Sequence, residues 1–351
     1  MLVYYLTYIF ASFLTILSGK KNTKVFYGIL FFILLILLIS FRYQVGGDWY
    51  SYLDHYNTLI NIPFKNIFQY GFDPGHAFVN WIMGQYKLGI YGVNFIYALI
   101  FTIGLFVFSI HQPNPFLALA VAFPYLVLVV AMGYSRQSVA IGFFMLALTY
   151  MQKQNFWKYV FWIFMAALFH KTALVLLPFA LFIKKEKKSW WVYVIILVPA
   201  LYGGWNMLIE PHLEHLVNIY VGRHKESSGA FIRVMMNAIP AVLFLINRKK
   251  WKRFFYTDYK FWLWISIASI SSLFFLTISS TVVDRLSLYF IPLQLVVYSR
   301  LPDIYKNKVS PRIIKICIII FYGVVLFVWL NFASHSNEWL PYQNIIFKDI
   351  V

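Results

Sequence analysis

Long apolar runs that follow one another along the whole chain are the feature that most constrains its fold. Of the 351 residues, 61% are hydrophobic and only 12% are charged, and the mean hydropathy is +0.70. A continuous run of about 17–25 apolar residues is the length of helix that crosses a bilayer. The sequence therefore predicts an all-α, polytopic membrane protein with about 10–12 transmembrane helices. The clearest spans are expected near residues 2–18, 24–41, 91–110, 114–132, 137–152, 189–209, 231–247, 260–280, 283–300 and 312–332.

Two further apolar segments do not fit a simple span. Residues 75–88 are expected to form a short re-entrant or interfacial helix. Residues 156–183 are too long for one span and short for two, and they carry His170-Lys171 at their midpoint. Two short helices that meet near the outer face at His170-Lys171 are the favoured interpretation, and one long tilted span is the alternative. The simplest organisation is one multi-pass membrane domain over residues 1–351.

The N-terminal run, residues 2–18, is expected to be a span rather than a cleaved signal peptide. It has no basic segment before its apolar residues and no A-x-A-like cleavage site. We therefore count it as the first crossing of the membrane.

Basic residues gather at the ends of the apolar runs. The net charge of +18 would suit a nucleic acid, but each basic cluster adjoins a span, as positive-inside residues do. We therefore expect the lipid bilayer, and no nucleic acid, as the partner of this charge. Placing the clusters in the cytoplasm puts both termini and the loops near 42–75 and 210–230 on the outer side. The clusters are Lys20/Lys21/Lys24, Lys153/Lys158, Lys184 to Lys188, Arg248 to Arg253 and Arg300 to Lys315.

A second group of cations lies at the predicted outer ends of the spans. Arginine forks and ammonium groups at one membrane face suit the dense negative charge of a pyrophosphate. Simpler explanations stay open for single members. Arg42 could extend to a lipid phosphate, and Arg285 could pair with Asp284, although adjacent helix residues do not face each other. The residues predicted to bind pyrophosphate are Arg42, Arg136, Lys171 and Arg285, and Arg223, His224, Lys225 and Arg233 surround the second outer loop.

The first outer loop carries a group of residues that suits a sugar ligand. Aromatic side chains offer flat apolar faces with polar tips to sugar rings, and carboxylates accept hydrogen bonds from sugar hydroxyls. Gly46-Gly47 permits a tight backbone turn there. The residues predicted to bind sugar are Trp49, Tyr50, Asp73 and Gln137.

Sequence motifs for other chemistry are missing. The chain has no G-x-x-x-x-G-K-[ST], G-x-G-x-x-G, C-x-x-C or H-E-x-x-H pattern. Its single cysteine, Cys317, excludes an intrachain disulfide. His212 and His215 are three residues apart, but the acids around them make an amphipathic loop helix the simpler explanation. We therefore expect no metal site and no cofactor.

Several short motifs follow one another in an order typical of a known family. They are Arg42 with Val45-Gly46-Gly47-Asp48 and Tyr50/Tyr52, Asp73-Pro74-Gly75 before Phe78, Ser135-Arg136-Gln137, His170-Lys171-Thr172 before Leu177-Pro178, and Asp284-Arg285 before Tyr289-Phe290. Their order and spacing resemble the EpsG family, the Wzy-like polymerases of exopolysaccharide and O-antigen repeat units. The resemblance covers roughly residues 1–330.

The resemblance implies a metal-independent glycosyltransferase, similar in architecture to GT-C membrane transferases. Such polymerases act at the outer face of the bacterial cytoplasmic membrane on oligosaccharides carried by undecaprenyl pyrophosphate. The growing glycan passes from its lipid pyrophosphate to a sugar hydroxyl of the next lipid-linked unit. A flippase and a chain-length regulator are the protein partners that this reaction implies.

Asp48 and His170 are the two candidates for the catalytic base in that reaction. A second role stays open for each residue. Asp48 could bind sugar hydroxyls without taking a proton. His170 could instead hydrogen-bond a phosphate oxygen.

Two other functions stay open at this point. A transporter or flippase of lipid-linked oligosaccharides would also need an outward cationic cavity. It should, however, carry charges deep in several spans and often show repeat symmetry. An O-antigen ligase would share the cations and differ mainly in its acceptor.

Overall fold

The chain is almost entirely helical. The computed structural model describes residues 1–17, 20–183, 189–208, 229–277 and 280–347. These residues contain no β-strand, only an isolated bridge between Arg42 and Asn344. The all-α prediction is confirmed. The α-helices are α1 (Leu2–Ile16), α2 (Lys21–Ser40), α3 (Trp49–Ile60), α4 (Pro74–Gln85), α5 (Gly89–Ile110), α6 (Pro115–Ala122), α7 (Ser135–Gln152), α8 (Phe156–Ala167), α9 (Trp190–Leu208), α11 (Ala230–Ile246), α12 (Arg248–Phe254), α13 (Tyr259–Phe275), α14 (Ser280–Ser287), α15 (Pro292–Ile304) and α16 (Pro311–Phe332).

Short helices of other types connect them. The 3₁₀ segments are η1 (Phe64–Gln69), η3 (Lys171–Phe182), η4 (Leu288–Phe290), η5 (Ser336–Trp339) and η6 (Ile345–Phe347), and η2 (Phe123–Ala131) is a π-helix. Where a predicted span is described, its helix or helix pair begins and ends within a few residues of the predicted limits.

By length and apolar composition, α2, α5 and α16 are each able to cross a membrane alone. Two bent pairs also qualify when each is counted as one span, α11 with α12 at 78° and α14–η4 with α15 at 42°. Pro292 begins α15 and has no N–H to extend the preceding hydrogen-bond ladder, which fits a break at that point. The other apolar helices are shorter. The protein is a polytopic membrane protein, and the predicted ten to twelve crossings stay a prediction.

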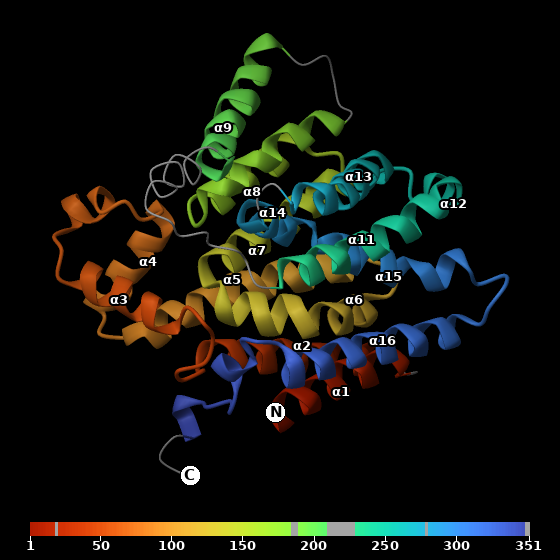
Figure 1. Cartoon of the computed structure of the whole chain (residues 1–351), viewed down its shortest axis with the longest axis horizontal. Helices are drawn as coiled ribbons and strands as arrows, with labels where there is room; N and C mark the ends of the chain where they lie inside the picture. The colour runs from red at the N-terminus through yellow and green to blue at the C-terminus, as the bar shows by residue number, and fades with distance from the viewer. Residues whose placement is uncertain (18–19, 184–188, 209–228, 278–279, 348–351) are drawn as a thin grey trace.

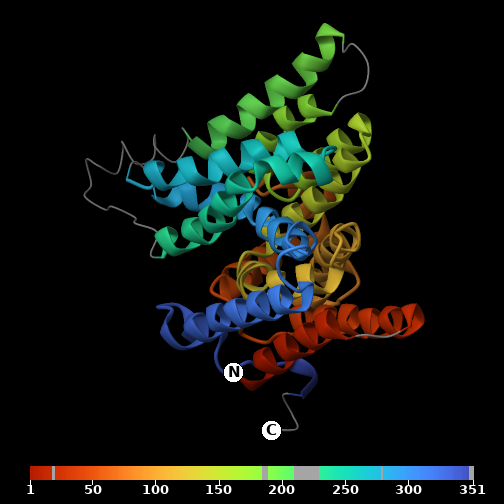
Figure 2. The ribbon, with the colours of Figure 1, turned by 90° about the vertical axis from the view of Figure 1, so that its right-hand side faces the viewer.

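The most buried helices form the centre of the molecule. Every residue from Leu117 to Ala131, along α6 and η2, is buried. Figures 1 and 2 show α1, α2 and α16 on one side of this centre, and α9 and α13 on the other. A Cβ at Gly104 of α5 would lie 2.1 Å from the carbonyl oxygen of Gly142 in α7, so a glycine is needed for this close helix contact.

The loop before α3 is held at one end of the bundle by the C-terminal segment. The N–H of Gly46 donates to the carbonyl of Glu338 (2.8 Å), and the N–H of Tyr43 donates to the carbonyl of Gln343 (2.9 Å). Gly46 has a φ of +104°, and a Cβ there would lie 2.3 Å from the carbonyl oxygen of Met132. The glycine therefore lets this loop pack onto the junction of η2 and α7.

Both irregular segments are helical, and they meet. α4 forms over the first of them, beside α3 at the left of Figure 1. The second divides into α8 and η3 with a break at His170, so the two-helix interpretation is confirmed and the single long span is not formed. The N–H of Gly75 in α4 donates to the carbonyl of Leu168 (2.6 Å), which fastens α4 to that break.

Parts of two predicted features lie outside the described residues. The second outer loop, near 210–230, falls almost wholly in such a segment, together with Arg223, His224 and Lys225. The basic cluster Lys184 to Lys188 does so as well.

Candidate active site

A polar cavity of ≈ 330 Å³ lies where the beginnings of α3 and α7, the break at His170 and the end of α14 approach one another. Five of the ten predicted site residues line it, although they are spread over more than half of the chain. They are Asp48, Arg136, Gln137, His170 and Arg285. The other lining residues are Tyr52, Tyr125, Tyr134, Thr281, Asp284 and Leu288.

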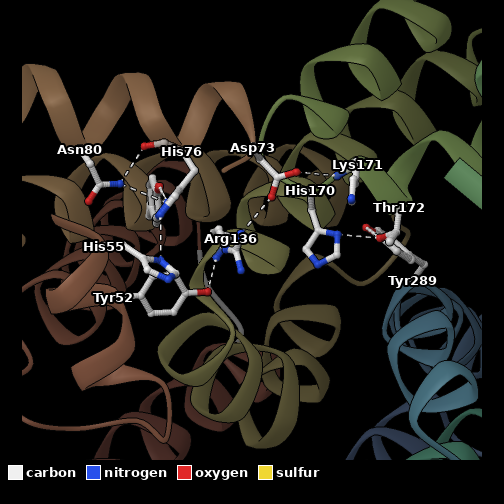
Figure 3. Close-up of polar contacts among 11 residues, drawn as sticks. Tyr52, His55, Asp73, His76, Asn80, Arg136, His170, Lys171, Thr172 and Tyr289 are labelled. Carbon is white, nitrogen blue, oxygen red and sulfur yellow. Dashed lines mark hydrogen bonds and ion pairs between the residues drawn. The ribbon is translucent and has the colours of Figure 1, made fainter. Parts of the chain in front are cut away.

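Arg136 is positioned from two sides at the start of α7. Its Nη1 donates to Oδ2 of Asp73 (3.1 Å), and its backbone N–H donates to the hydroxyl of Tyr52 (3.1 Å). Figure 3 shows the guanidinium between these two partners. Its Nε is buried and has no hydrogen-bond partner among the described residues. Arg136 is thus fixed in place with part of its donor set still unused.

Asp73 connects the two irregular segments to Arg136. It precedes α4, and its second oxygen accepts a hydrogen bond from the backbone N–H of Lys171 (3.2 Å). Burial raises the pKa of the Asp73 carboxyl, although the charge of Arg136 and the N–H of Lys171 oppose that rise. Both carboxylate oxygens are therefore hydrogen-bonded within the protein. Asp73 positions Arg136 and does not itself line the cavity.

Arg285, at the end of α14, carries the second guanidinium of the cavity. Its neighbour Asp284 pairs with Arg233 of α11 through two hydrogen bonds, one of them 2.8 Å long. The alternative that Arg285 pairs with Asp284 is therefore wrong. Among the described residues the Arg285 side chain has no hydrogen bond or ion pair, while its carbonyl accepts from Nε2 of Gln137 (2.9 Å). Its positive charge is left for a ligand.

His170 lies in the break between α8 and η3, outside both helices. Its Nδ1 is 2.7 Å from the hydroxyl of Thr172, which is 3.0 Å from the hydroxyl of Tyr289. Burial, followed by the charges of Arg136, Arg285 and Lys171, lowers the pKa of His170 to about 3. The imidazole is therefore neutral near pH 7.

The proton on that imidazole follows from its neighbours. The buried Tyr289 hydroxyl has no other partner in the described part of the chain, so it is satisfied only by donating to Thr172. Thr172 then donates to Nδ1 of His170, and the proton of the ring stays on Nε2. His170 is therefore set up as a hydrogen-bond donor.

Asp48 precedes α3 and lines the cavity together with the two arginines. Burial raises the pKa of its carboxyl, whereas the charges of Arg136 and Arg285 act in the opposite direction. Burial has the larger effect, so the carboxylate is a stronger base than an exposed aspartate. Among the described residues its side chain makes no hydrogen bond.

Five predicted site residues do not line the cavity, and Asp73, described above, is one of them. Arg42 is only 2% exposed, and it donates to the carbonyls of Ile39 and Val45 (3.1 Å to the latter) and to the hydroxyl of Ser135 (2.9 Å). The ring of Trp49 packs 5.7 Å from this guanidinium. Tyr50 is 60% exposed, on the outside of α3. Lys171 enters the site through its backbone N–H at Asp73.

Tyr125 is a cavity residue that the sequence did not indicate. It is 5% exposed, and its hydroxyl has no hydrogen-bond partner among the described residues. It lies in η2, and π-helical turns occur frequently at functional sites. Pro124, inside an otherwise unbroken apolar run, was the one available signal of irregular helix there.

A row of polar residues behind Arg136 was also not expected. Nδ1 of His55 lies 3.2 Å from Nε2 of His76 (Figure 3). Nδ1 of His76 lies 2.6 Å from the hydroxyl of Tyr97. Asn80 donates to the carbonyl of His76 (2.7 Å). Burial and then the charge of Arg136 lower the pKa of both histidines. The contact between His55 and His76 therefore joins α3 to α4, and both imidazoles are neutral.

This geometry defines the class of protein: a polytopic membrane protein with a cation-lined polar cavity at one end of a helical bundle. The EpsG family model matches residues 24–344, nearly the whole chain. The chain therefore belongs to the EpsG family, whose members are Wzy-like polymerases, and the resemblance noted in the sequence is confirmed. No curated protein and no solved structure matches the chain.

Proposed function

We propose that this protein polymerises oligosaccharide repeat units carried on undecaprenyl pyrophosphate. The observation that supports this most directly is the meeting of two arginines, an aspartate and a histidine in one polar cavity. In the reaction, the oxygen of an acceptor sugar hydroxyl attacks the anomeric carbon of the donor glycan. The bond from that carbon to the phosphate oxygen breaks, and undecaprenyl pyrophosphate leaves with the electron pair. The hydroxyl proton passes to a base of the enzyme.

Arg136 and Arg285 stabilise the charge that develops on the leaving pyrophosphate. Donors that are already in place act strongly, because nothing has to reorganise during the reaction. A planar guanidinium also grips two phosphate oxygens at once. Lys171 adds its charge to the same region. Arg42 has no part in this proposal, since its guanidinium is occupied by carbonyls and a hydroxyl.

Asp48 takes the proton of the acceptor hydroxyl, and His170 donates a hydrogen bond to a phosphate oxygen. Two observations favour this division. The carboxylate has no partner among the described residues and is made more basic by burial. The imidazole keeps its proton on Nε2, and its lowered pKa makes it a poor base.

The sugar rings contact the tyrosines and the amide of the cavity. Tyr125 and Tyr134 offer aromatic faces with hydroxyl tips, which suit sugar rings. Gln137 adds an amide oxygen for a sugar hydroxyl, since its nitrogen donates to the carbonyl of Arg285. The exposed Tyr50 is too far out on α3 to line this cavity, so it stays a candidate only for a longer glycan.

The cavity opens toward the outer side of the bacterial cytoplasmic membrane. The basic helix α12, which carries a positive-inside cluster, lies at the end of the molecule away from α3 and α4 (Figure 1). Lipid-linked units that have been moved across the membrane are then the donor and the acceptor. A flippase would supply them, and a chain-length regulator would act on the product.

We also propose that no divalent metal takes part. The two arginines supply the positive charge that a metal ion gives to other pyrophosphate leaving groups. Among the described residues, no three His, Cys, Asp or Glu side chains are grouped to hold an ion.

The test is incubation of the full-length protein in lipid nanodiscs with labelled lipid-linked repeat units in EDTA. A ladder of products is expected from the wild type and from the control variant Arg248→Lys, which is exposed on α12. A single transfer to another acceptor would instead identify a ligase. Movement of the donor across a vesicle bilayer without a new glycosidic bond would identify a flippase. Loss of the ladder in EDTA and its return with Mg²⁺ would overturn the metal-free mechanism.

A further inference from the structure

An apolar groove of ≈ 670 Å³ lies at the end of the bundle opposite the candidate active site. It forms where α2 and α16 begin and α5 ends, so the three helices able to cross a membrane alone meet there. Along α2, the distance from Lys21 in the groove to Ser40 near the active-site loop is about 30 Å. The apolar floor includes Val25, Ile29, Phe32, Phe106, Ile110 and Phe116.

Three lysines from two helices line the groove: Lys21 and Lys24 of α2 and Lys315 of α16. In the described part of the chain none of them forms an ion pair. Lys315 is half-buried, and it is close enough to Lys24 for the two charges to repel each other. Asp303 attracts Lys315, but it also accepts a hydrogen bond from Asn114 (2.9 Å). The groove therefore carries an excess of positive charge beside apolar surface.

We propose that this groove binds one anionic membrane phospholipid. The phosphate lies among the three lysines, and an acyl chain covers the apolar floor. Basic groups at the ends of transmembrane helices attract anionic head groups, and an acyl chain removes the floor from water. A phosphate ion alone would leave the floor uncovered. A zwitterionic lipid would leave the net charge of the lysines unbalanced. The groove has the size of sites that bind specific small ligands.

The lipid would contact α2 and α16 at the same time and so link these two helices at this end of the bundle. A ligand that binds the folded state alone raises the stability of that state. Lipid binding can therefore be measured without glycan synthesis, and this inference does not rest on the proposed function.

The test is native mass spectrometry of the detergent-purified full chain titrated with phosphatidylglycerol, and with phosphatidylcholine of the same acyl chains. We expect one retained phosphatidylglycerol and a much weaker signal for phosphatidylcholine. In the triple variant Lys21→Gln/Lys24→Gln/Lys315→Gln the affinity should fall by about a hundredfold, at about fivefold per lysine. The matched control Lys252→Gln/Lys306→Gln/Lys308→Gln changes three exposed lysines outside the groove and should keep the wild-type affinity.

A second variant fills the groove without changing its charge. A Cβ at Gly28 would lie 3.5 Å from the ring of Phe116, an ordinary contact, so Gly28→Leu is tolerated by the backbone. It should also lose the lipid, and excess inorganic phosphate should not displace the lipid from the wild type. Equal loss in both lysine triples would show general attraction to a basic surface. That result, undiminished binding in Gly28→Leu, or displacement by phosphate would each overturn the proposal.

Discussion

Two arginine–aspartate pairs, one at each end of the molecule, differ in how completely they are satisfied. Arg300 and Asp258, toward the basic end, have side chains that are only 4% and 3% exposed. Arg300 donates to both oxygens of Asp258 (3.1 and 2.6 Å) and to Gln112 (3.0 Å). Asp258 also accepts from Gln152 and Trp262, both at 3.0 Å.

Arg136 and Asp73, beside the cavity, form a looser pair. Their side chains are 30% and 10% exposed, and a single 3.1 Å contact joins them. One buried nitrogen of Arg136 has no partner in the described chain. A buried ion pair whose donors are all used holds helices together and has nothing left for a ligand. An arginine held in place with a donor to spare is prepared to bind one.

The largest effect is expected at the base. Asp48→Asn keeps the size of the side chain but cannot take a proton, and activity should fall by about 10²- to 10⁴-fold. In the wild type, activity should fall as the pH drops through the pKa of Asp48, which burial raises above its usual value of 3.8. The measurement is the initial rate of ladder formation against pH. If His170→Ala removes this acidic limb and Asp48→Asn does not, the two roles are exchanged.

Arg136→Lys should lose activity by about 10²-fold, because an ammonium keeps the charge but cannot reproduce the planar two-point grip. Arg285→Lys should behave in the same way. The amount of each variant in the membrane should equal that of the wild type. Normal chain growth with lysine at both positions would mean that these arginines only anchor the helices, and the contrast between the two pairs would disappear.

Arg300→Gln should have the opposite profile. It leaves Asp258 buried without its cation, which costs about 3–5 kcal/mol of unfolding free energy. The rate per folded molecule should remain close to that of the wild type, because this pair is far from the cavity. Thermal unfolding of the purified protein, together with activity normalised to folded protein, measures both quantities. If Arg300→Gln kept the wild-type stability but lost its rate per folded molecule, the Arg300–Asp258 pair would serve the reaction rather than the fold.

The helices could be predicted from the sequence because length and hydropathy act locally. The apolar runs predicted the limits of the helices to within a few residues, and the break at His170 was expected from its charges in an apolar stretch. The meeting of Asp48, Arg136, His170 and Arg285 was also expected, since all were placed at outer span ends.

The state of each cation could not be predicted in the same way. Arg42 and Arg136 look alike as arginines next to apolar runs. Only the packing of the chain decides that Arg42 meets two carbonyls and a hydroxyl, whereas Arg136 keeps an unused nitrogen. Likewise, Asp284 pairs with Arg233, which is distant in sequence. Such pairings depend on how distant helices approach one another, and a sequence pattern does not contain that information.

The smallest effect is expected for Tyr125, which no sequence pattern indicated. Tyr125→Phe removes one neutral hydroxyl, so activity should fall by about two- to tenfold, as for the loss of one hydrogen bond to the substrate. The matched control is Tyr159→Phe, since the Tyr159 hydroxyl donates to the carbonyl of Leu176 (2.8 Å) away from the cavity. That control should lose stability and keep its rate per folded molecule. Tyr125→Phe should keep its stability, because its hydroxyl has no partner to lose among the described residues. If Tyr125→Phe worked at the wild-type rate, the Tyr125 hydroxyl would make no hydrogen bond to the substrate, and η2 would contribute no polar group to the reaction.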